Sequence, residues 1–266
     1  MTIPLYGVST FTTEFFRGNP AAVCLLDADD DRDDTWYARV SALTAQPATA
    51  FCRPAASGFS LRWFSPSHEL ELCGHGTLAT AHVLYETGTV DQQDEVVLHA
   101  RSGPLRVRRE GDRSWISLPA VPLAVLPAPV DVLIGLGLSS ALSFSRSTDD
   151  LVVELGSADE VEKVRPDFRL LAQLPTTRTI VTAAGGDGVD FTSRVFPPRI
   201  GIHEDQVTGS AHAALGPYWA RRLGRQQLTA RQASARGGEL ALDLSVDGVV
   251  QVGGRAVTTI RGELLV

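Results

Sequence analysis

The sequence predicts an α+β protein built as two pseudo-symmetric lobes, because both halves of the chain carry the same patterns in the same order. The repeated pairs are RWFSP at 62–66 with RVFPP at 194–198, Gly-Thr at 76–77 with Gly-Ser at 209–210, and ARSGPLRV at 100–107 with ARGGELAL at 235–242. Their offsets of 132, 133 and 135 residues lie close to half of the 266-residue chain. Such a constant spacing indicates an internal duplication.

The first lobe is expected over residues 1–119, and it begins with two strands joined by the GNP turn at 18–20. An acidic run follows, whose last aspartates are expected to cap a helix. Its D-x-D-x-D spacing is similar to a calcium loop, but Arg32 stands where such a loop needs glycine. The expected strands are 6–10, 21–26, 49–54, 59–66, 96–100, 105–110 and 114–118, and the expected helices are 35–45 and 76–87.

The second lobe is expected over residues 126–254 and repeats this plan. The proline-rich stretch 114–130 is interpreted as the connector between the lobes, since its prolines interrupt regular backbone pairing. The main helix of this lobe is expected to stop at Gly224. The expected strands are 151–155, 179–184, 190–196, 228–234, 238–245, 249–254 and an additional one at 257–266, and the expected helices are 159–163 and 209–223.

Composition excludes several classes of function. A net charge of −7 argues against binding to nucleic acid or to an anionic membrane surface, because both need clustered basic residues. The three cysteines form no CxxC pair, which favours a reduced cytoplasmic protein without a disulfide framework or a zinc cluster. The N-terminus lacks the basic region and apolar core of a signal peptide.

The two repeated helix starts indicate where chemistry takes place. A glycine before a helix permits close approach of a ligand, and the first-turn N–H groups with the positive end of the helix dipole bind anions. Two such starts that face each other would hold a carboxylate and stabilise the charge that develops when a neighbouring carbon loses a proton. The titratable residues next to them are Cys73, His75 and Asp205. This set predicts proton transfer without a metal or a cofactor.

Four motifs carry a resemblance to a known family. They are GNPAAV at 18–23, RWFSPSHELELCGHGTLATA at 62–81, EDQVTGSAHAALGPYWARRLG at 204–224 and QASARGGEL at 232–240. Together they resemble the phenazine-biosynthesis isomerase family (PhzF-like), within the diaminopimelate-epimerase-like fold. The resemblance covers essentially the whole chain. It implies two lobes, each a curled, mostly antiparallel, barrel-like sheet around a central helix, with residues 255–266 returning to the first lobe and the site in the cleft.

The resemblance also implies a function. It implies a cofactor-independent isomerase that moves a proton, by double-bond migration or epimerisation, on a small unsaturated or cyclic amino-acid-like carboxylate. A role in specialised metabolism and a homodimeric assembly are further expectations of this kind. By position, the resemblance assigns Asp205, His75 and Ser210 to the reacting centre. It assigns the substrate-binding positions to Asn19, Ala48, Cys73, Gly74, Gly76, Thr77, Thr208 and Gly209.

One position departs from the family pattern. Before the Thr-Ala-Phe strand start the family has a glutamate that shuttles the proton, whereas this chain has Ala48. A placed general base contributes roughly 10²–10⁴-fold to a rate, and alanine cannot move a proton. Another residue therefore takes over, the reaction changes to a cyclisation or elimination, or the protein binds a small molecule without turnover. If residue 48 points into a lobe core, Gln46 and Thr49 are the next side chains to consider.

Each candidate residue also has a purely structural interpretation. Cys73 fits a buried inert thiol better than half of a two-thiol racemase, because Gln206 stands at its expected partner position. His75 fits a loop-fixing histidine, Asp205 a helix cap, and Ser210 a simple first-turn residue. The other histidines considered are His82 and His212, which are expected to pack inside the helices, and His68, which is expected to be exposed in a turn.

Overall fold

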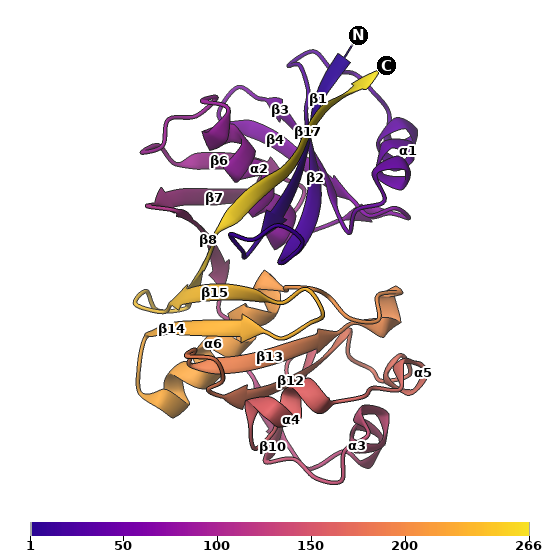
Figure 1. The fold of residues 1–266 in the computed structure, drawn as a ribbon, viewed down its shortest axis with the longest axis vertical. Coiled ribbons are helices and arrows are strands. Elements are labelled where there is room, and N and C mark those ends of the chain that lie inside the picture. The colour runs from indigo at the N-terminus through magenta and orange to yellow at the C-terminus, as the bar shows by residue number, and fades with distance from the viewer. Residues whose placement is uncertain (1, 266) are drawn as a thin grey trace. The chain divides into compact units, whose positions relative to one another are not determined.

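The chain folds into two compact units, formed by residues 1–117 with 253–266 and by residues 118–252 (Figure 1). The structure, a computed structural model, describes residues 2–265. Both units contain strands and helices, and the predicted α+β fold is confirmed. Within residues 2–265, no helix combines the length and the apolar character needed to cross a membrane.

The first unit is a mixed sheet with two helices. β1 is antiparallel to β2 and β17, while β2 runs parallel to β3 and β3 antiparallel to β4. The helices are α1 (Asp34–Thr44) and α2 (Gly74–Glu86). The strands are β1 (Thr2–Thr10), β2 (Asn19–Leu25), β3 (Thr49–Pro54), β4 (Phe59–Phe64), β5 (Glu69–Leu70), β6 (Val96–Ala100), β7 (Gly103–Glu110), β8 (Arg113–Pro119) and β17 (Ala256–Leu265).

Strand alternation gives the sheet of the first unit two different faces. Phe51 and Phe64 point to the face covered by α1, where they pack against Tyr37. The cross-strand pair of Ala50 and Trp63 points to the other face, on which α2 packs. Figure 1 shows the two helices on opposite sides of β1 and β2. Most residues of α2 are buried, as expected for a central helix.

The second unit has the same plan with additional short elements. Its sheet pairs β11 parallel to β12, and β12 antiparallel to β13. The helices are α3 (Val130–Leu136), α4 (Ala158–Lys163), α5 (Phe168–Leu171) and α6 (Gly209–Leu223), with a 3₁₀ turn at Pro198–Ile200. The strands are β9 (Ala124–Leu126), β10 (Ser143–Arg146), β11 (Asp150–Glu154), β12 (Arg178–Ala184), β13 (Phe191–Phe196), β14 (Gln227–Gln232), β15 (Gly238–Asp243) and β16 (Val249–Gly254).

The two faces of this sheet also differ. Val181 and Phe196 join a buried apolar cluster with Val161 of α4 on one face. On the other face lies α6, whose Trp219 donates from Nε1 to Thr182 Oγ1 of β12 at 3.0 Å. Both units therefore place a mostly buried helix on one face of a sheet and a smaller helix on the other.

The helix starts correct the predicted register of the duplication. α2 begins at Gly74 and α6 at Gly209, so Gly74 rather than Gly76 is the counterpart of Gly209. The two helix starts are therefore 135 residues apart, which is also the offset of the third sequence repeat. The predicted pairing of Gly76 with Gly209 was wrong because the connection between strand and helix is longer in the second unit, which shifts the spacing between the first repeat and the helix.

Two other expectations need correction. The stretch 114–130 is not a plain connector, since it contains part of β8, all of β9 and the first residue of α3. β5, β9, β10, α3 and α5 were not predicted, because all are short, the longest being α3 with seven residues. The expected cap of α1 is confirmed: Asp33 accepts a hydrogen bond from the backbone N–H of Trp36 at 2.9 Å.

Gly76 lies so close to β4 that a side chain there is expected to destabilise the first unit. A Cβ at Gly76 would lie 2.7 Å from Trp63 Cδ1 and 3.0 Å from Cys73 Sγ, whereas one at Gly74 meets no atom within 4 Å. We expect Gly76→Ala to lower the free energy of unfolding by about 1–3 kcal/mol. Gly74→Ala is the matched control and should be neutral or stabilising. Urea denaturation of both variants measures this, and equal stabilities would contradict the packing described here.

His212 is expected to make stability depend on pH. It is fully buried in α6, with Nδ1 2.9 Å from Thr208 O, and burial lowers its pKa from 6.5 to about 4. Below pH 6.5 the unfolded chain therefore binds a proton that the folded chain does not. The free energy of unfolding should fall as pH drops from 6.5 towards 4, by about 3 kcal/mol from this residue.

The control for this pH dependence is His212→Phe, which keeps an aromatic ring beside Phe191 but cannot titrate. Unfolding curves of both proteins between pH 7 and pH 5 isolate the histidine, because most carboxylates stay ionised there. If both proteins lose stability in parallel over this range, His212 is not the group responsible.

Candidate active site

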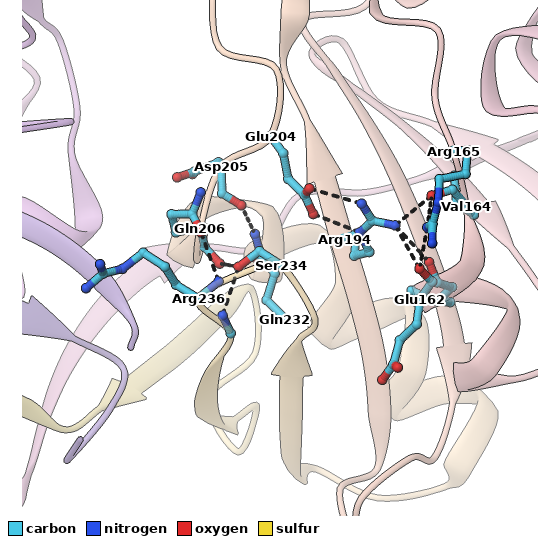
Figure 2. Close-up of polar contacts among 12 residues, drawn as sticks. Glu162, Val164, Arg165, Arg194, Glu204, Asp205, Gln206, Gln232, Ser234 and Arg236 are labelled. Carbon is cyan, nitrogen blue, oxygen red and sulfur yellow. Dashed lines mark hydrogen bonds and ion pairs between the residues drawn. The ribbon is translucent and has the colours of Figure 1, made fainter. Parts of the chain in front are cut away.

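The loop before α6 is held by an ion pair between Arg194 and Glu204 (Figure 2). Nε and Nη2 of Arg194 donate to the two oxygens of Glu204 at 2.8 and 3.0 Å. Nη1 donates to backbone carbonyls at the end of α4, the shortest being Val164 O at 2.9 Å. Both side chains of the pair are largely buried, so this planar two-point contact fixes the loop firmly.

Asp205 follows directly and is held by its backbone and its carboxylate. Its N–H donates to Val195 O of β13 at 3.0 Å, and its Oδ2 accepts from the Thr208 hydroxyl at 2.6 Å. Gln232 of β14 donates to Asp205 O at 2.8 Å and accepts from the Thr208 N–H at 2.8 Å. The carboxylate therefore has a defined position just ahead of the helix start.

The next residue, Gln206, is fixed by the loop after β14. Ser234 donates from its hydroxyl to Gln206 O at 2.7 Å, and the N–H of Arg236 donates to Gln206 Oε1 at 3.2 Å. These contacts explain the QASARGGEL motif, since its residues support the Asp205 loop (Figure 2).

Ser210 lies in the first turn of α6 and contacts a buried ion pair. Arg178, the first residue of β12, donates from Nη1 to Ser210 Oγ at 2.7 Å. The same guanidinium makes a two-point contact with Asp150 of β11, with Nε and Nη2 at 2.5 and 3.0 Å from its oxygens. The carboxylate of Asp150 is only 1% exposed. The α6 start thus combines helix N–H groups, a hydroxyl and a cationic side chain.

The first unit repeats the ion pair at its own helix start. Nε and Nη2 of Arg62 donate to Glu69 at 2.8 and 2.9 Å, and Nη1 reaches Asp34 at the start of α1. The hydrogen bonds from Arg62 hold the pKa of Glu69 below its ordinary value. Each arginine also lies over the phenylalanine two residues ahead, at about 5 Å from the ring of Phe64 and of Phe196.

Cys73 and His75 flank the start of α2. Cys73 is the N-cap residue and is buried, with Sγ 3.5 Å from Nδ1 of the half-exposed His75. Thr77 is buried too, and its hydroxyl donates to Cys73 O at 2.7 Å. In the corrected register, Cys73 corresponds to Thr208 and His75 to Ser210. The position equivalent to Cys73 is therefore Thr208 and not Gln206 as expected. Since neither is a cysteine, the two units do not supply a pair of equivalent thiols.

The other two cysteines, Cys24 and Cys52, lie in the sheet interior. Burial raises the pKa of each to about 12, so both are neutral thiols at physiological pH. Among residues 2–265, no three His, Cys, Asp or Glu side chains gather in a way that would hold a metal ion.

Asn19 and Ala48 lie at neighbouring strand starts of the first unit. Asn19, the first residue of β2, is buried, and its carbonyl accepts from the Thr10 hydroxyl at 3.1 Å. Ala48 precedes β3 and extends its pairing, since its carbonyl accepts from the Ala22 N–H at 2.9 Å. By alternation Ala48 shares the sheet face of Ala50 and therefore of α2.

Ala48 is fully buried, and the strand register identifies its counterpart in the second unit. Thr49 pairs with Phe64, and Thr179 pairs with Phe196 in the same antiparallel arrangement. Ala48 thus corresponds to Arg178, which contacts Ser210, the counterpart of His75. By this correspondence, a long side chain at residue 48 would extend towards the α2 start. Thr49 is excluded as a substitute, because it faces the other side, where its hydroxyl lies 2.7 Å from Thr44 Oγ1.

The structure groups the predicted site residues within each unit. In the second unit, Asp205, Thr208, Gly209 and Ser210 follow one another at the α6 start. In the first, residues 73–77 form the α2 start, and Ala48 lies on the strand face that α2 covers. Asp205 is not the helix cap that was considered, since Thr208 occupies that position.

The other histidines fit their structural interpretations. His212 is fully buried, His82 lies 3.1 Å from Thr258 Oγ1, and His68 is exposed in its turn.

Three residues of this site were not found in the sequence: Asp150, Arg178 and Gln232. They come from strands far from the helix start in the chain. Gln232 opens the QASARGGEL motif, whereas nothing in the local sequence marks Asp150 or Arg178. The Arg62–Glu69 and Arg194–Glu204 pairs did leave a signal, because each arginine starts a repeated pattern and each glutamate precedes the helix by the same spacing.

Comparison with known proteins places these features in a family. A model of phenazine biosynthesis-like proteins (PhzC-PhzF) matches residues 8–262. An uncharacterized isomerase of Halalkalibacterium halodurans is 40% identical over 267 residues, covering 100% of this chain and 99% of that protein. A phenazine biosynthesis protein of the PhzF family from Enterococcus faecalis has a crystal structure with a TM-score of 0.95 at 36% identity, with 100% of both chains covered.

The fold extends to epimerases. The structure of a hydroxyproline epimerase from Agrobacterium vitis, 12% identical, has a TM-score of 0.63 and covers 99% of this chain and 92% of its own. The sequence match over residues 8–262 and the related structures agree. The chain belongs to the phenazine biosynthesis-like family, with a diaminopimelate-epimerase-like fold.

Proposed function

We propose that this protein is a cofactor-independent isomerase that moves a proton on a small unsaturated or cyclic amino-acid-like carboxylate. The observation that carries the proposal is Asp205, a carboxylate fixed by Thr208 and Gln232 just ahead of a helix start. A carboxylate held in this way acts as a general base when a substrate C–H lies within reach. Relatives about 40% identical are named isomerases, which supports the same reaction class here.

In the proposed reaction, Asp205 removes a proton from the carbon next to the substrate carboxylate. The negative charge spreads into that carboxylate, where the first-turn N–H groups of α6 and the Ser210 hydroxyl stabilise it. His75 is the second proton-transferring group and returns a proton at the new position. Return to the same carbon from the opposite face gives epimerisation, and return two atoms away gives double-bond migration.

Ala48 favours a second candidate function, a small-molecule-binding protein without turnover. A methyl group at this position supplies no proton, and the position corresponds to Arg178, which contacts the counterpart of His75 in the second unit. The fold and the anion-binding helix start would serve binding equally well. A changed reaction, cyclisation or elimination, is the third possibility, because Asp205 alone suffices to remove a proton.

Asp205→Asn tests the acid–base role. A carboxamide keeps the shape and still accepts from Thr208, but it cannot exchange a proton, so we expect the rate to fall about 10²–10⁴-fold. The measurement is deuterium incorporation from D₂O into a panel of small amino-acid-like carboxylates, followed by mass spectrometry. Asp247→Asn, at an exposed site of the same unit, is the control. A near-normal rate in Asp205→Asn would remove Asp205 from the mechanism.

Ala48→Glu separates the candidate functions. If the site is adapted to the protein's own substrate, the added carboxylate should lower native proton exchange at least about tenfold, because a buried charge is costly there. Trp63 lies on the same sheet face as residue 48, and its buried indole N–H has no acceptor among residues 2–265. We therefore expect the glutamate of Ala48→Glu to accept a hydrogen bond from this N–H.

Ala48→Gln, of the same size but uncharged, is the control for crowding. A rise in exchange with Ala48→Glu on a substrate typical of the family would contradict adaptation. It would indicate instead a binding protein that lost its proton shuttle.

A further inference from the structure

We propose that Arg178, held by Asp150, is a positioning residue that fixes the direction of the Ser210 hydroxyl, so that α6 receives a hydrogen-bond-accepting anion, the substrate carboxylate. This inference deepens the proposed function and rests on it. It assigns the carboxylate to the α6 start rather than to the α2 start.

The direction follows from the chemistry of the guanidinium. Arg178 has only donors, so Ser210 Oγ must accept in the 2.7 Å contact. The hydroxyl proton of Ser210 then has to point elsewhere, and none of the residues 2–265 accepts it. Ser210 is therefore a donor towards whatever molecule occupies the α6 start.

Asp150 fixes the guanidinium itself. It binds Arg178 at two points from a position that is 1% exposed, so the plane of the guanidinium has little freedom. A lysine at 178 would give a single point charge and could not make the two-point contact with Asp150 while reaching Ser210. The arrangement thus selects arginine for its geometry as well as its charge.

The first unit has no equivalent of the contact between Arg178 and Ser210. The counterparts of Arg178 and Ser210 are Ala48 and His75, so the α2 start has no guanidinium and no hydroxyl at the equivalent positions. Donors for an anion are therefore concentrated at α6. The α2 start offers a titratable imidazole instead. The duplicated helix starts have therefore diverged: α6 carries donors for an anion, and α2 carries an imidazole.

The test is binding of sodium benzoate, a small planar carboxylate, measured by the shifts of the Gly209 and Ser210 amides in ¹⁵N-labelled protein. Benzamide, which lacks the charge, is the reference ligand. We expect benzoate to shift both amides and benzamide to bind at least about tenfold more weakly. Ser210→Ala should weaken benzoate binding by about tenfold or more, the usual effect of losing a hydrogen bond to a charged group.

Removing Arg178 alone would leave Asp150 buried without a partner, so the pair is replaced together as Asp150→Leu with Arg178→Met, an apolar exchange that buried ion pairs often tolerate. This double variant should weaken benzoate binding by about three- to tenfold, because the hydroxyl is no longer directed. Adding Ser210→Ala to it should then cost less than twofold further. Arg222→Met is the control. Arg222 lies in the last turn of α6, where it contacts Glu154 of β11. Its replacement should keep benzoate affinity within twofold.

If Ser210→Ala weakens benzoate binding as strongly in the double variant as in the unaltered protein, the proposal is overturned. It is also overturned if benzoate does not shift the Gly209 and Ser210 amides of the unaltered protein. A double variant that does not fold is replaced by Arg178→Lys, for which the same loss of benzoate affinity is expected and unchanged affinity overturns the proposal. The outcome is separate from the isomerase proposal. If Asp205→Asn abolishes exchange while these variants bind normally, only the role of Arg178 falls.

Discussion

Two guanidinium–carboxylate contacts, Arg62–Glu69 and Arg194–Glu204, hold the loops from which both candidate helix starts emerge. Each arginine lies on a strand facing the smaller helix, over a phenylalanine, and reaches across to that helix. Arg194 is nearly buried, so breaking its pair would leave a charge and several carbonyls unsatisfied, at a cost of about 3–5 kcal/mol. The position of Asp205 depends on this contact because it follows Glu204 directly.

The two units share this backbone arrangement but differ in the side chains that it carries. Thr77 and His212 occupy equivalent positions, and both donate to the carbonyl of the N-cap residue, from Oγ1 at 2.7 Å and from Nδ1 at 2.9 Å. By contrast, Ala48 and Arg178 are equivalent in position and opposite in chemistry. The shared backbone therefore carries different side chains in the two units.

Sequence reasoning found the duplication, the two helix starts and the loop that carries Asp205, because glycines and repeated motifs mark them locally. It misplaced the register by two residues at Gly76, since a longer strand-to-helix connection in the second unit cannot be seen in a repeat of short patterns. It missed Arg178 and Asp150, which lie 28 residues apart on paired strands; Arg178 contacts Ser210 of α6, 32 residues further along the chain. Side chains brought together by a sheet leave no local signal.

The most direct test of this account is a double-mutant cycle on Arg194 and Glu204, read by hydrogen exchange at the Asp205 and Thr208 amides. Arg194→Met should make both amides exchange at least about tenfold faster, and Arg194→Met with Glu204→Leu should restore most of their protection. Both amides are bonded in the native loop, to Val195 O and to Gln232 Oε1. Unchanged protection in Arg194→Met, or strictly additive losses, would contradict the claim that this ion pair positions Asp205.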